Sequence, residues 1–94
     1  MIKSYRGKDT EKVGSGEFSR RFPRDIQRRA KMRLDRISAA ARLQDLAVPP
    51  SHRLEPLKGK RRGQHSIRIN DQWRICFRWR DGDAYDVEIV DYHK

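Results

Sequence analysis

Apolar and polar side chains alternate through most of the last third of the chain, in runs broken only at residues 70–72 and 81–83. A period of two places successive side chains on opposite faces of a β-strand. The apolar positions are Ile67, Ile69, Trp73, Ile75, Phe77, Trp79, Tyr85, Val87 and Ile89. This pattern predicts an antiparallel three-strand meander with one buried face and one open face.

The turns decide which residues face each other across this sheet. A three-residue loop at 81–83 places Phe77 opposite Val87, and both side chains are apolar. A two-residue loop would instead place Phe77 opposite Asp86 and bury a carboxylate. We therefore expect the three-residue loop, and a loop of the same length at 70–72. The expected pairs are Phe77–Val87, Ile75–Ile89, Ile69–Trp73 and Ile67–Ile75.

The same register places like charges together on the outer face, where Arg68 meets Arg74 while Arg78 meets Asp86. Like charges directly opposite each other destabilise a sheet by a few tenths of a kcal/mol, on the order of other cross-strand pairs. The two arginines form either a solvated, mildly repelling pair or an anion site, and the basic composition favours the anion site. Truncating Arg74 is therefore expected to leave stability unchanged or slightly raised.

The segment before the meander has helical periodicity. Steps of three and four residues place one set of apolar side chains on a single helix face. This set is Ile26, Ala30, Leu34, Ile37 and Ala41. Pro23 suits the first helical position, because that position needs no N–H. We expect a break near 39–41, a second short helix through Leu43 and Leu46, and an end at the prolines 49–50.

A short strand is also expected at residues 2–6, before a glycine-containing connector. The predicted fold is therefore α+β, in the order strand, helix, helix and three-strand meander, with the two helices packed on the antiparallel sheet. The 94 residues suffice for one compact domain, so residues 1–94 are expected to form a single domain.

The charge balance points to a polyanionic partner. Lys and Arg number 23 against 13 Asp and Glu, a formal net charge of +10, and nucleic acid is the leading candidate. No long apolar run or lipid-facing amphipathic segment favours a membrane, and the N-terminal segment lacks the apolar stretch of a secretory signal. Cys76 alone excludes an internal disulfide and fits a reducing cytoplasm. One Cys with three scattered His has no zinc-ligand spacing, so neither a metal nor another cofactor is expected.

Three groups able to take part in proton transfer follow the last strand: Asp91, Tyr92 and His93. The preceding segment brings four cations to the same neighbourhood: Lys58, Lys60, Arg61 and Arg62. Cleavage of RNA by its own 2′-hydroxyl requires a base, an acid and cations for the developing charge. An imidazole titrates at about 6.5 and can serve as either acid or base. With Arg68 and Arg74 on the same face, the cluster is suited to metal-free RNA cleavage.

Residues 54–93 resemble the HigB-like branch of the RelE superfamily, the toxins of bacterial toxin–antitoxin operons. The similar motifs are "LEPLKG", "SIRINDQWRI" and the terminal "DYH". The resemblance implies a ribosome-dependent mRNA endonuclease that arrests translation. It also implies a neutralising helix-turn-helix antitoxin (HigA-like), with operator DNA bound only through that antitoxin.

The resemblance assigns roles residue by residue. Asp91, Tyr92 and His93 match the family's terminal catalytic residues, and Arg74 matches the arginine that contacts the scissile phosphate. Lys58 matches the basic residue of L-K-G. Glu55 stands where some relatives carry a histidine, so either Glu55 serves as the base or the activity is weaker.

Two other functions are compatible with a basic chain of this size. A non-catalytic RNA- or ribosome-binding module would need the cations but no proton carriers, so the terminal Asp-Tyr-His favours the enzyme. A DNA-binding regulator would need a recognition helix after a turn, and that signature is missing after the basic helix.

Overall fold

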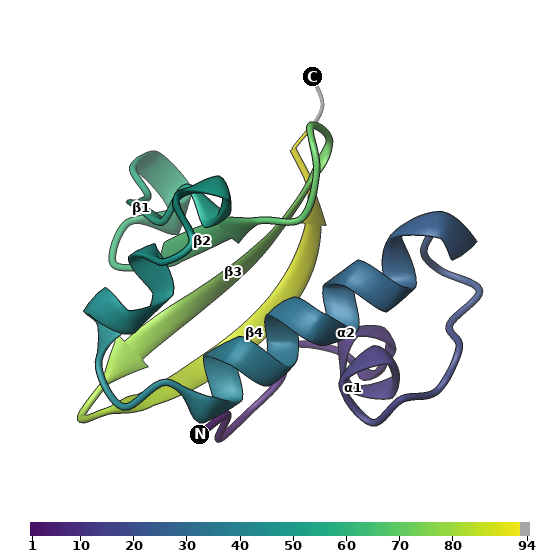
Figure 1. Ribbon diagram of the computed structural model, residues 1–94, viewed down its shortest axis with the longest axis horizontal. Coiled ribbons are helices and arrows are strands. Elements are labelled where there is room, and N and C mark those ends of the chain that lie inside the picture. Colours follow the sequence, from purple (N-terminus) through teal and green to yellow (C-terminus); the bar gives the residue numbers. More distant parts are fainter. Residues whose placement is uncertain (93–94) are drawn as a thin grey trace.

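The computed structural model describes residues 1–92, and within them two helices accompany a four-stranded antiparallel sheet (Figure 1). The helices are α1 (Lys8–Gly14) and α2 (Arg24–Ala39). The strands are β1 (Glu55–Pro56), β2 (His65–Arg68), β3 (Trp73–Arg80) and β4 (Asp83–Asp91), and they neighbour one another in chain order. Short 3-10 helices occupy the connections: η1 (Leu43–Ala47), η2 (Pro50–His52) and η3 (Gly59–Arg61). The predicted α+β class is confirmed.

Helix α2 covers one face of the sheet with the apolar residues that its periodicity predicted. Ile26, Ala30, Leu34 and Ile37 are all buried. The helix ends at Ala39, and the extended backbone of Ala40 carries that residue into the core. Ala41 was expected on the buried face, but it is exposed because the helical period has already ended.

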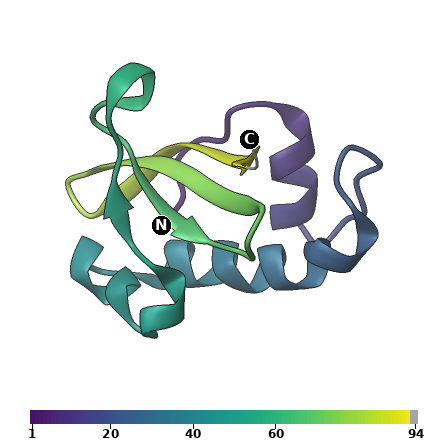
Figure 2. The same ribbon diagram turned by 90° about the horizontal axis from the view of Figure 1, so that it is seen from above.

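The N-terminal segment forms less sheet than expected. Ile2 and Tyr5 make isolated parallel bridges to Ala84 and Val87, so the segment lies along the free edge of β4 without becoming a strand. Helix α1 follows and contacts both α2 and β4. In Figure 2, α2 lies below the sheet and the loop that contains η3 lies above it.

A two-residue turn joins β3 to β4, which corrects the expected three-residue loop. Arg80 pairs with Asp83, and the two residues between them, Asp81 and Gly82, have φ values of 53° and 83°. Positive φ at both central residues is the requirement of a type I′ turn, which matches the twist of antiparallel strands.

A β-bulge then restores the register that the sequence predicted. Cys76 pairs with Glu88 and Arg78 pairs with Tyr85, so Phe77 faces both Asp86 and Val87. Asp86 takes up the extra residue with a φ of 54° and remains exposed. The carboxylate is therefore not buried, although the turn has only two residues. Beyond the bulge, Ile75 lies opposite Ile89 and Ile67 opposite Ile75, as expected.

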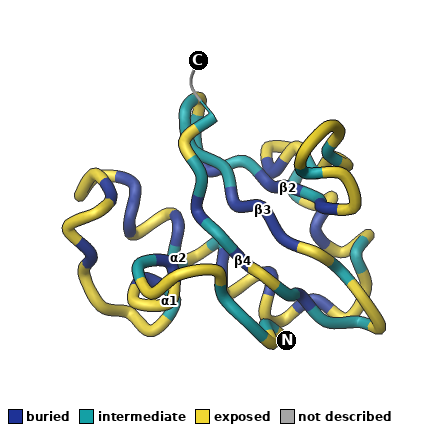
Figure 3. The backbone as a smooth tube through the Cα atoms, turned by 180° about the vertical axis from the view of Figure 1, so that it is seen from behind, coloured by how far each residue is buried: buried dark blue, intermediate teal, exposed yellow. Residues whose placement is uncertain are grey.

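The face of the sheet turned away from α2 is called the open face. Alternation along β2 and β3 assigns it Ser66, Arg68, Arg74, Cys76, Arg78 and Arg80. The middle of β3 is nevertheless buried on both sides, since Ile75, Cys76 and Phe77 are all 0 % exposed (Figure 3). The arginine side chains of the open face therefore lie at its two ends, on either side of a buried centre.

Candidate catalytic and RNA-binding site

Arg68 and Arg74 lie directly opposite each other on the open face, as the register predicted. Each is also held by a carboxylate. The guanidinium of Arg68 bonds Asp71, and Nη2 of Arg74 lies 3.3 Å from Oε1 of Glu55. The like-charge repulsion is therefore partly offset, because each guanidinium has a carboxylate partner.

Arg74 has further partners that make it part of the structure. Its Nε donates to Ser66 Oγ at 2.8 Å, and its Nη2 donates to the carbonyl of Arg53 at 2.8 Å. Its side chain is only 12 % exposed. These contacts favour the opposite of the expected effect of truncating Arg74, because truncation would leave the acceptors without their donor.

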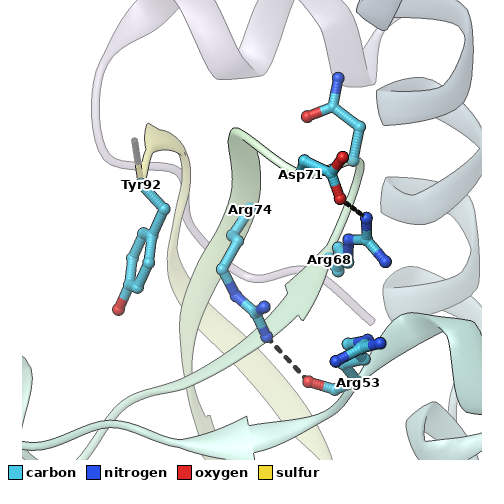
Figure 4. Close-up of a pocket in the computed structure, with 6 residues that line it drawn as sticks. Arg53, Arg68, Asp71, Arg74 and Tyr92 are labelled. Atoms are coloured by element: carbon cyan, nitrogen blue, oxygen red, sulfur yellow. Dashed lines mark hydrogen bonds and ion pairs between the residues drawn. The ribbon is translucent and has the colours of Figure 1, made fainter. Parts of the chain in front are cut away.

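Arg74 borders a cavity of about 320 Å³ at the end of the open face, here called the arginine cavity. It is lined by Arg53, Arg68, Asn70, Asp71, Arg74 and Tyr92. Figure 4 shows Arg74 between Tyr92 on one side and Arg53 and Arg68 on the other. Three arginines against one aspartate give the lining a positive balance, which suits a phosphate group.

Tyr92 forms the wall of the arginine cavity next to the chain end. Its backbone N–H donates to the carbonyl of Gln72 at 2.6 Å, and its ring centroid lies 5.7 Å from the Arg74 guanidinium carbon. Burial raises the pKa of Tyr92 above its ordinary value of 10.0, and the cations of Arg61 and Arg74 oppose that rise. The phenol is therefore protonated at neutral pH and can donate a hydrogen bond.

Two other predicted catalytic residues, Glu55 and Asp91, lie next to residues of this cavity. Glu55 reaches Arg74 from β1, and half of its side chain is exposed. Asp91 ends β4, close to the predicted end at Val90, and accepts a hydrogen bond from Gln72 Nε2 at 3.1 Å. His93 lies outside the residues that the structure describes, so its predicted role stays a prediction.

The predicted RNA-binding cations of the η3 loop flank the same face. Arg61 donates to Gln64 and pairs with Glu88 of β4 at 3.3 Å, which ties the loop to the sheet. The positive charge of Arg61 also acts on Tyr92, where it opposes the rise in the pKa of the phenol. The side chains that remain exposed in this loop are Lys58, Lys60 and Arg62.

The sequence did not predict Asn70 and Asp71, which line the arginine cavity, nor two residues that contact Arg74, which are Arg53 and Ser66. Arg53 lines the arginine cavity and supplies a carbonyl to Arg74, from a left-handed backbone conformation with a φ of 48°. Ser66 anchors Nε of Arg74, and its place two residues before Arg68 was a signal, since alternation puts both on the open face.

His52 belongs to the core. It is 1 % exposed, and its Nδ1 donates to the carbonyl of Leu46 at 3.1 Å. Burial lowers the pKa of His52 below its ordinary value, and this histidine is not among the residues that line the arginine cavity. Within residues 1–92, no group of three or more potential metal-binding side chains is present. No helix in that range is long and apolar enough to cross a membrane.

A helix-backed antiparallel sheet of this kind is shared with two solved structures of RelE-like toxins. The structure is similar to that of a mutant of YafQ from E. coli, with a TM-score of 0.63, 12% identity, and 97% of this chain and 93% of that chain covered. It is also similar to a chain of the YoeB–YefM complex from Staphylococcus aureus, with a TM-score of 0.57, 15% identity, and 100% and 99% covered.

The chain belongs to the HigB-like toxins, described as RelE-like toxins of the type II toxin–antitoxin system HigB, whose family pattern matches residues 5–93. Toxin HigB-1 of Vibrio cholerae is 39% identical over 75 residues, covering 80% of this chain and 78% of the relative. Endoribonuclease HigB of Proteus vulgaris is 34% identical over 93 residues, covering 99% and 100%. The predicted family is confirmed, and the name of the Proteus relative agrees with the predicted class of enzyme.

Proposed function

We propose that this toxin is an endoribonuclease that cleaves mRNA on the ribosome, without a metal, by attack of a 2′-hydroxyl on the adjacent phosphate. The observation that carries the proposal is the position of Arg74. It lies between Tyr92 and Arg68, beside Glu55, near the start of β3 and opposite Val90 of β4, the strand that precedes His93 in the chain. A phosphate in the arginine cavity would meet cations and a phenol together.

Arg74 binds the scissile phosphate and stabilises the charge that develops on it. Within the described residues, its contacts use Nε and Nη2, which leaves the N–H groups of Nη1 for a phosphate oxygen. Arg68 adds a second positive charge across the sheet. A phosphate on Nη1 competes with Glu55 for the charge of Arg74, and release of that ion pair on Nη2 frees the carboxylate to act as a base near the 2′-hydroxyl.

The proton carriers are assigned to the end of the chain. His93 protonates the leaving 5′-oxygen, and Asp91 orients the imidazole or accepts a proton. Tyr92 donates its hydrogen bond to the nucleophile or a phosphate oxygen, or stacks on a base. It does not act as a base itself, because burial holds its pKa above the ordinary value.

The ribosome supplies the alignment that this half-open site lacks. Lys58, Lys60, Arg61 and Arg62 bind RNA next to the arginine cavity, where neutralised phosphates release counterions. Bent mRNA in the decoding site would bring the 2′-oxygen in line with the phosphate, an effect that reaches roughly 7–11 kcal/mol in well-oriented reactions. Because the substrate is mRNA on the ribosome, the toxin is expected to act in the cytoplasm, where ribosomes work.

The partner of a type II toxin is its antitoxin. We propose a helix-turn-helix antitoxin of the HigA type, through which the toxin reaches operator DNA indirectly. The likeness to a chain of the YoeB–YefM complex supports stable pairing with a second protein, although the two toxins share only the fold.

One purified transcript, incubated alone and on programmed ribosomes at matched salt, tests the proposal. The free transcript should be cleaved slowly and the ribosome-bound one rapidly, and Arg74→Lys should lose most of the ribosomal rate, because a lysine cannot bind phosphate in the same fork geometry. Arg28→Lys, on the exposed face of α2, is the matched control and should cleave normally. Equal rates in the two conditions would indicate a free-standing ribonuclease. Ribosome binding without cleavage would indicate a non-catalytic RNA-binding module.

A further inference from the structure

A second cavity lies at the opposite end of the open face, where β3 and β4 meet their turn. It has a volume of about 440 Å³ and is here called the hairpin cavity. Its lining residues are Gly63, Arg78, Trp79, Arg80, Tyr85 and Asp86, none of which borders the arginine cavity. Neither the family resemblance nor the proposed cleavage mechanism uses these residues.

The hairpin cavity offers flat surfaces on which a base can stack. The guanidinium carbon of Arg80 lies 4.8 Å from the ring centroid of Tyr85. Unpaired RNA bases stack on aromatic rings and on arginine planes, and this stacking is worth about 1–3 kcal/mol per base in single-strand binding proteins. Tyr85 pairs with Arg78 in the register, so their side chains project from the same face of the sheet.

Arg78 is placed to bind a phosphate beside that stack. It is 47 % exposed, and its Nε lies 3.7 Å from a carboxylate oxygen of Asp86, which is longer than a hydrogen bond. The carboxylate therefore holds Arg78 weakly and can be exchanged for a phosphate.

The η3 loop comes close to the same arginine. A side chain at Gly63 would place its Cβ 2.9 Å from Nη1 of Arg78, at a backbone φ of +91° that favours glycine. The loop that carries Lys60 and Arg62 thus connects the surroundings of the arginine cavity with the hairpin cavity.

Strand β3 joins the two cavities in a straight line. Arg74, Arg78 and Arg80 have the same parity and project from the open face. Arg74 and Arg80 are six residue steps apart along β3, a distance of about 20 Å at ~3.3 Å per residue.

We infer that the hairpin cavity is a second RNA subsite, which binds an unpaired nucleotide several positions away from the cleaved bond. Arg78 binds its phosphate, and the Arg80–Tyr85 pair stacks on its base. The inference rests on the proposed function, because it takes the same RNA to run along β3. The nucleotide belongs either to the flanking mRNA or to ribosomal RNA beside it, and the chemistry of recognition is the same.

Fluorescence anisotropy with single-stranded RNA of three and ten nucleotides tests the subsite without requiring cleavage. The double variant Arg78→Gln/Arg80→Gln should bind the ten-nucleotide RNA less tightly and the three-nucleotide RNA as before. Its salt slope should fall by about 0.7, for the one phosphate contact that Arg78 makes. The matched control, Arg20→Gln/Arg28→Gln, removes the same charge from the α1–α2 side and should keep most of the slope.

Tyr85 provides an independent check on the stacking. Tyr85→Leu should weaken ten-nucleotide binding about fivefold or more, and Tyr85→Phe, which keeps the ring, should not. Thermal unfolding curves show whether each variant is folded. The subsite is excluded if the two double variants lose affinity equally, or if folded Tyr85→Leu binds like the wild type. If the wild-type protein binds the RNAs as expected but does not cleave mRNA on ribosomes, the proposed enzymatic function is contradicted instead.

Programmed ribosomes then identify the source of the nucleotide. If the flanking mRNA occupies the hairpin cavity, truncating the transcript close to the cleaved bond should reduce the wild-type rate to that of Arg78→Gln/Arg80→Gln. If ribosomal RNA occupies it, truncation should leave the wild-type rate unchanged while the double variant stays slower. A double variant that cleaves both transcripts like the wild type would overturn the subsite.

Discussion

Arg74 serves two purposes at once, because the contacts that hold it in place also aim it at the arginine cavity. Ser66 and the carbonyl of Arg53 fix the guanidinium, and Glu55 offsets its charge until a phosphate takes over that role. The sequence predicted the pairing with Arg68 from alternation alone. It did not predict these partners, because Arg53 and Glu55 reach Arg74 through a loop and a two-residue strand that have no periodic pattern.

Arg74→Ala should therefore destabilise the protein by about 1–3 kcal/mol, since hydrogen bonds to a charged group are lost and their acceptors remain partly buried. Urea unfolding followed by circular dichroism measures the change. Arg28→Ala, on the exposed face of α2, should stay within about 0.5 kcal/mol of the wild type. Unchanged or increased stability of Arg74→Ala would mean that repulsion from Arg68 dominates.

Cys76 is completely buried at the centre of the open face, between Ser66 and Glu88 in the register. Burial raises the pKa of its thiol from 9.0 to about 11. The folded state therefore keeps the thiol proton in a range where the unfolded chain releases it. This contribution to stability is complete below pH 9 and declines as the pH rises from 9 to 11.

The difference in free energy of unfolding between the wild type and Cys76→Ala should accordingly shrink by about 1 kcal/mol between pH 8 and pH 10. Chemical denaturation of both proteins at the two pH values gives the four free energies of unfolding that this comparison requires. Other alkaline groups titrate in both proteins and cancel in the comparison. A gap that is constant with pH would show that the buried thiol titrates normally.

At the scale of elements, periodicity predicted α2 and the three long strands because burial of one face decides those patterns. The β3–β4 connection was predicted incorrectly for a physical reason. A type I′ turn together with a bulge at Asp86 replaces the single longer loop that was expected. Either arrangement keeps the carboxylate of Asp86 out of the core. Hydrophobic pattern alone cannot distinguish the two solutions, whereas Asp81-Gly82 is a known signal for the shorter turn.

Gly82→Ala should lower stability by about 1–2 kcal/mol, the approximate penalty for a side chain in the left-handed region. The nearest atom to an added Cβ is the carbonyl oxygen of Ala41 at 3.5 Å, an ordinary contact, so the effect reports the backbone conformation. Asp81→Asn is the control and should be nearly neutral, because Asn tolerates positive φ. Urea unfolding of both variants measures the difference, and a neutral Gly82→Ala would exclude the type I′ geometry.

On the scale of the whole molecule, a net charge of +10 predicted a polyanionic partner, and the two cavities of the open face hold part of that charge, while α2 carries another part. Cations gather at both ends of β3, while the helices cover the other face. The sequence placed Arg74 and Tyr92 correctly on one surface. It could not reveal the hairpin cavity, because that cavity depends on the bulge and on the approach of Gly63 to Arg78.

The central claim is that the RNA supplies its own nucleophile and the toxin supplies positioned charges and proton carriers. Programmed ribosomes carrying a transcript with a single 2′-deoxynucleotide at the cleaved position test it most directly, beside the all-ribose transcript at the same Mg²⁺ and salt concentrations. The account predicts equal toxin binding to both complexes and loss of cleavage only at the deoxy position. Cleavage of the deoxy transcript at the ribose rate would contradict it, since the nucleophile would then have to be water.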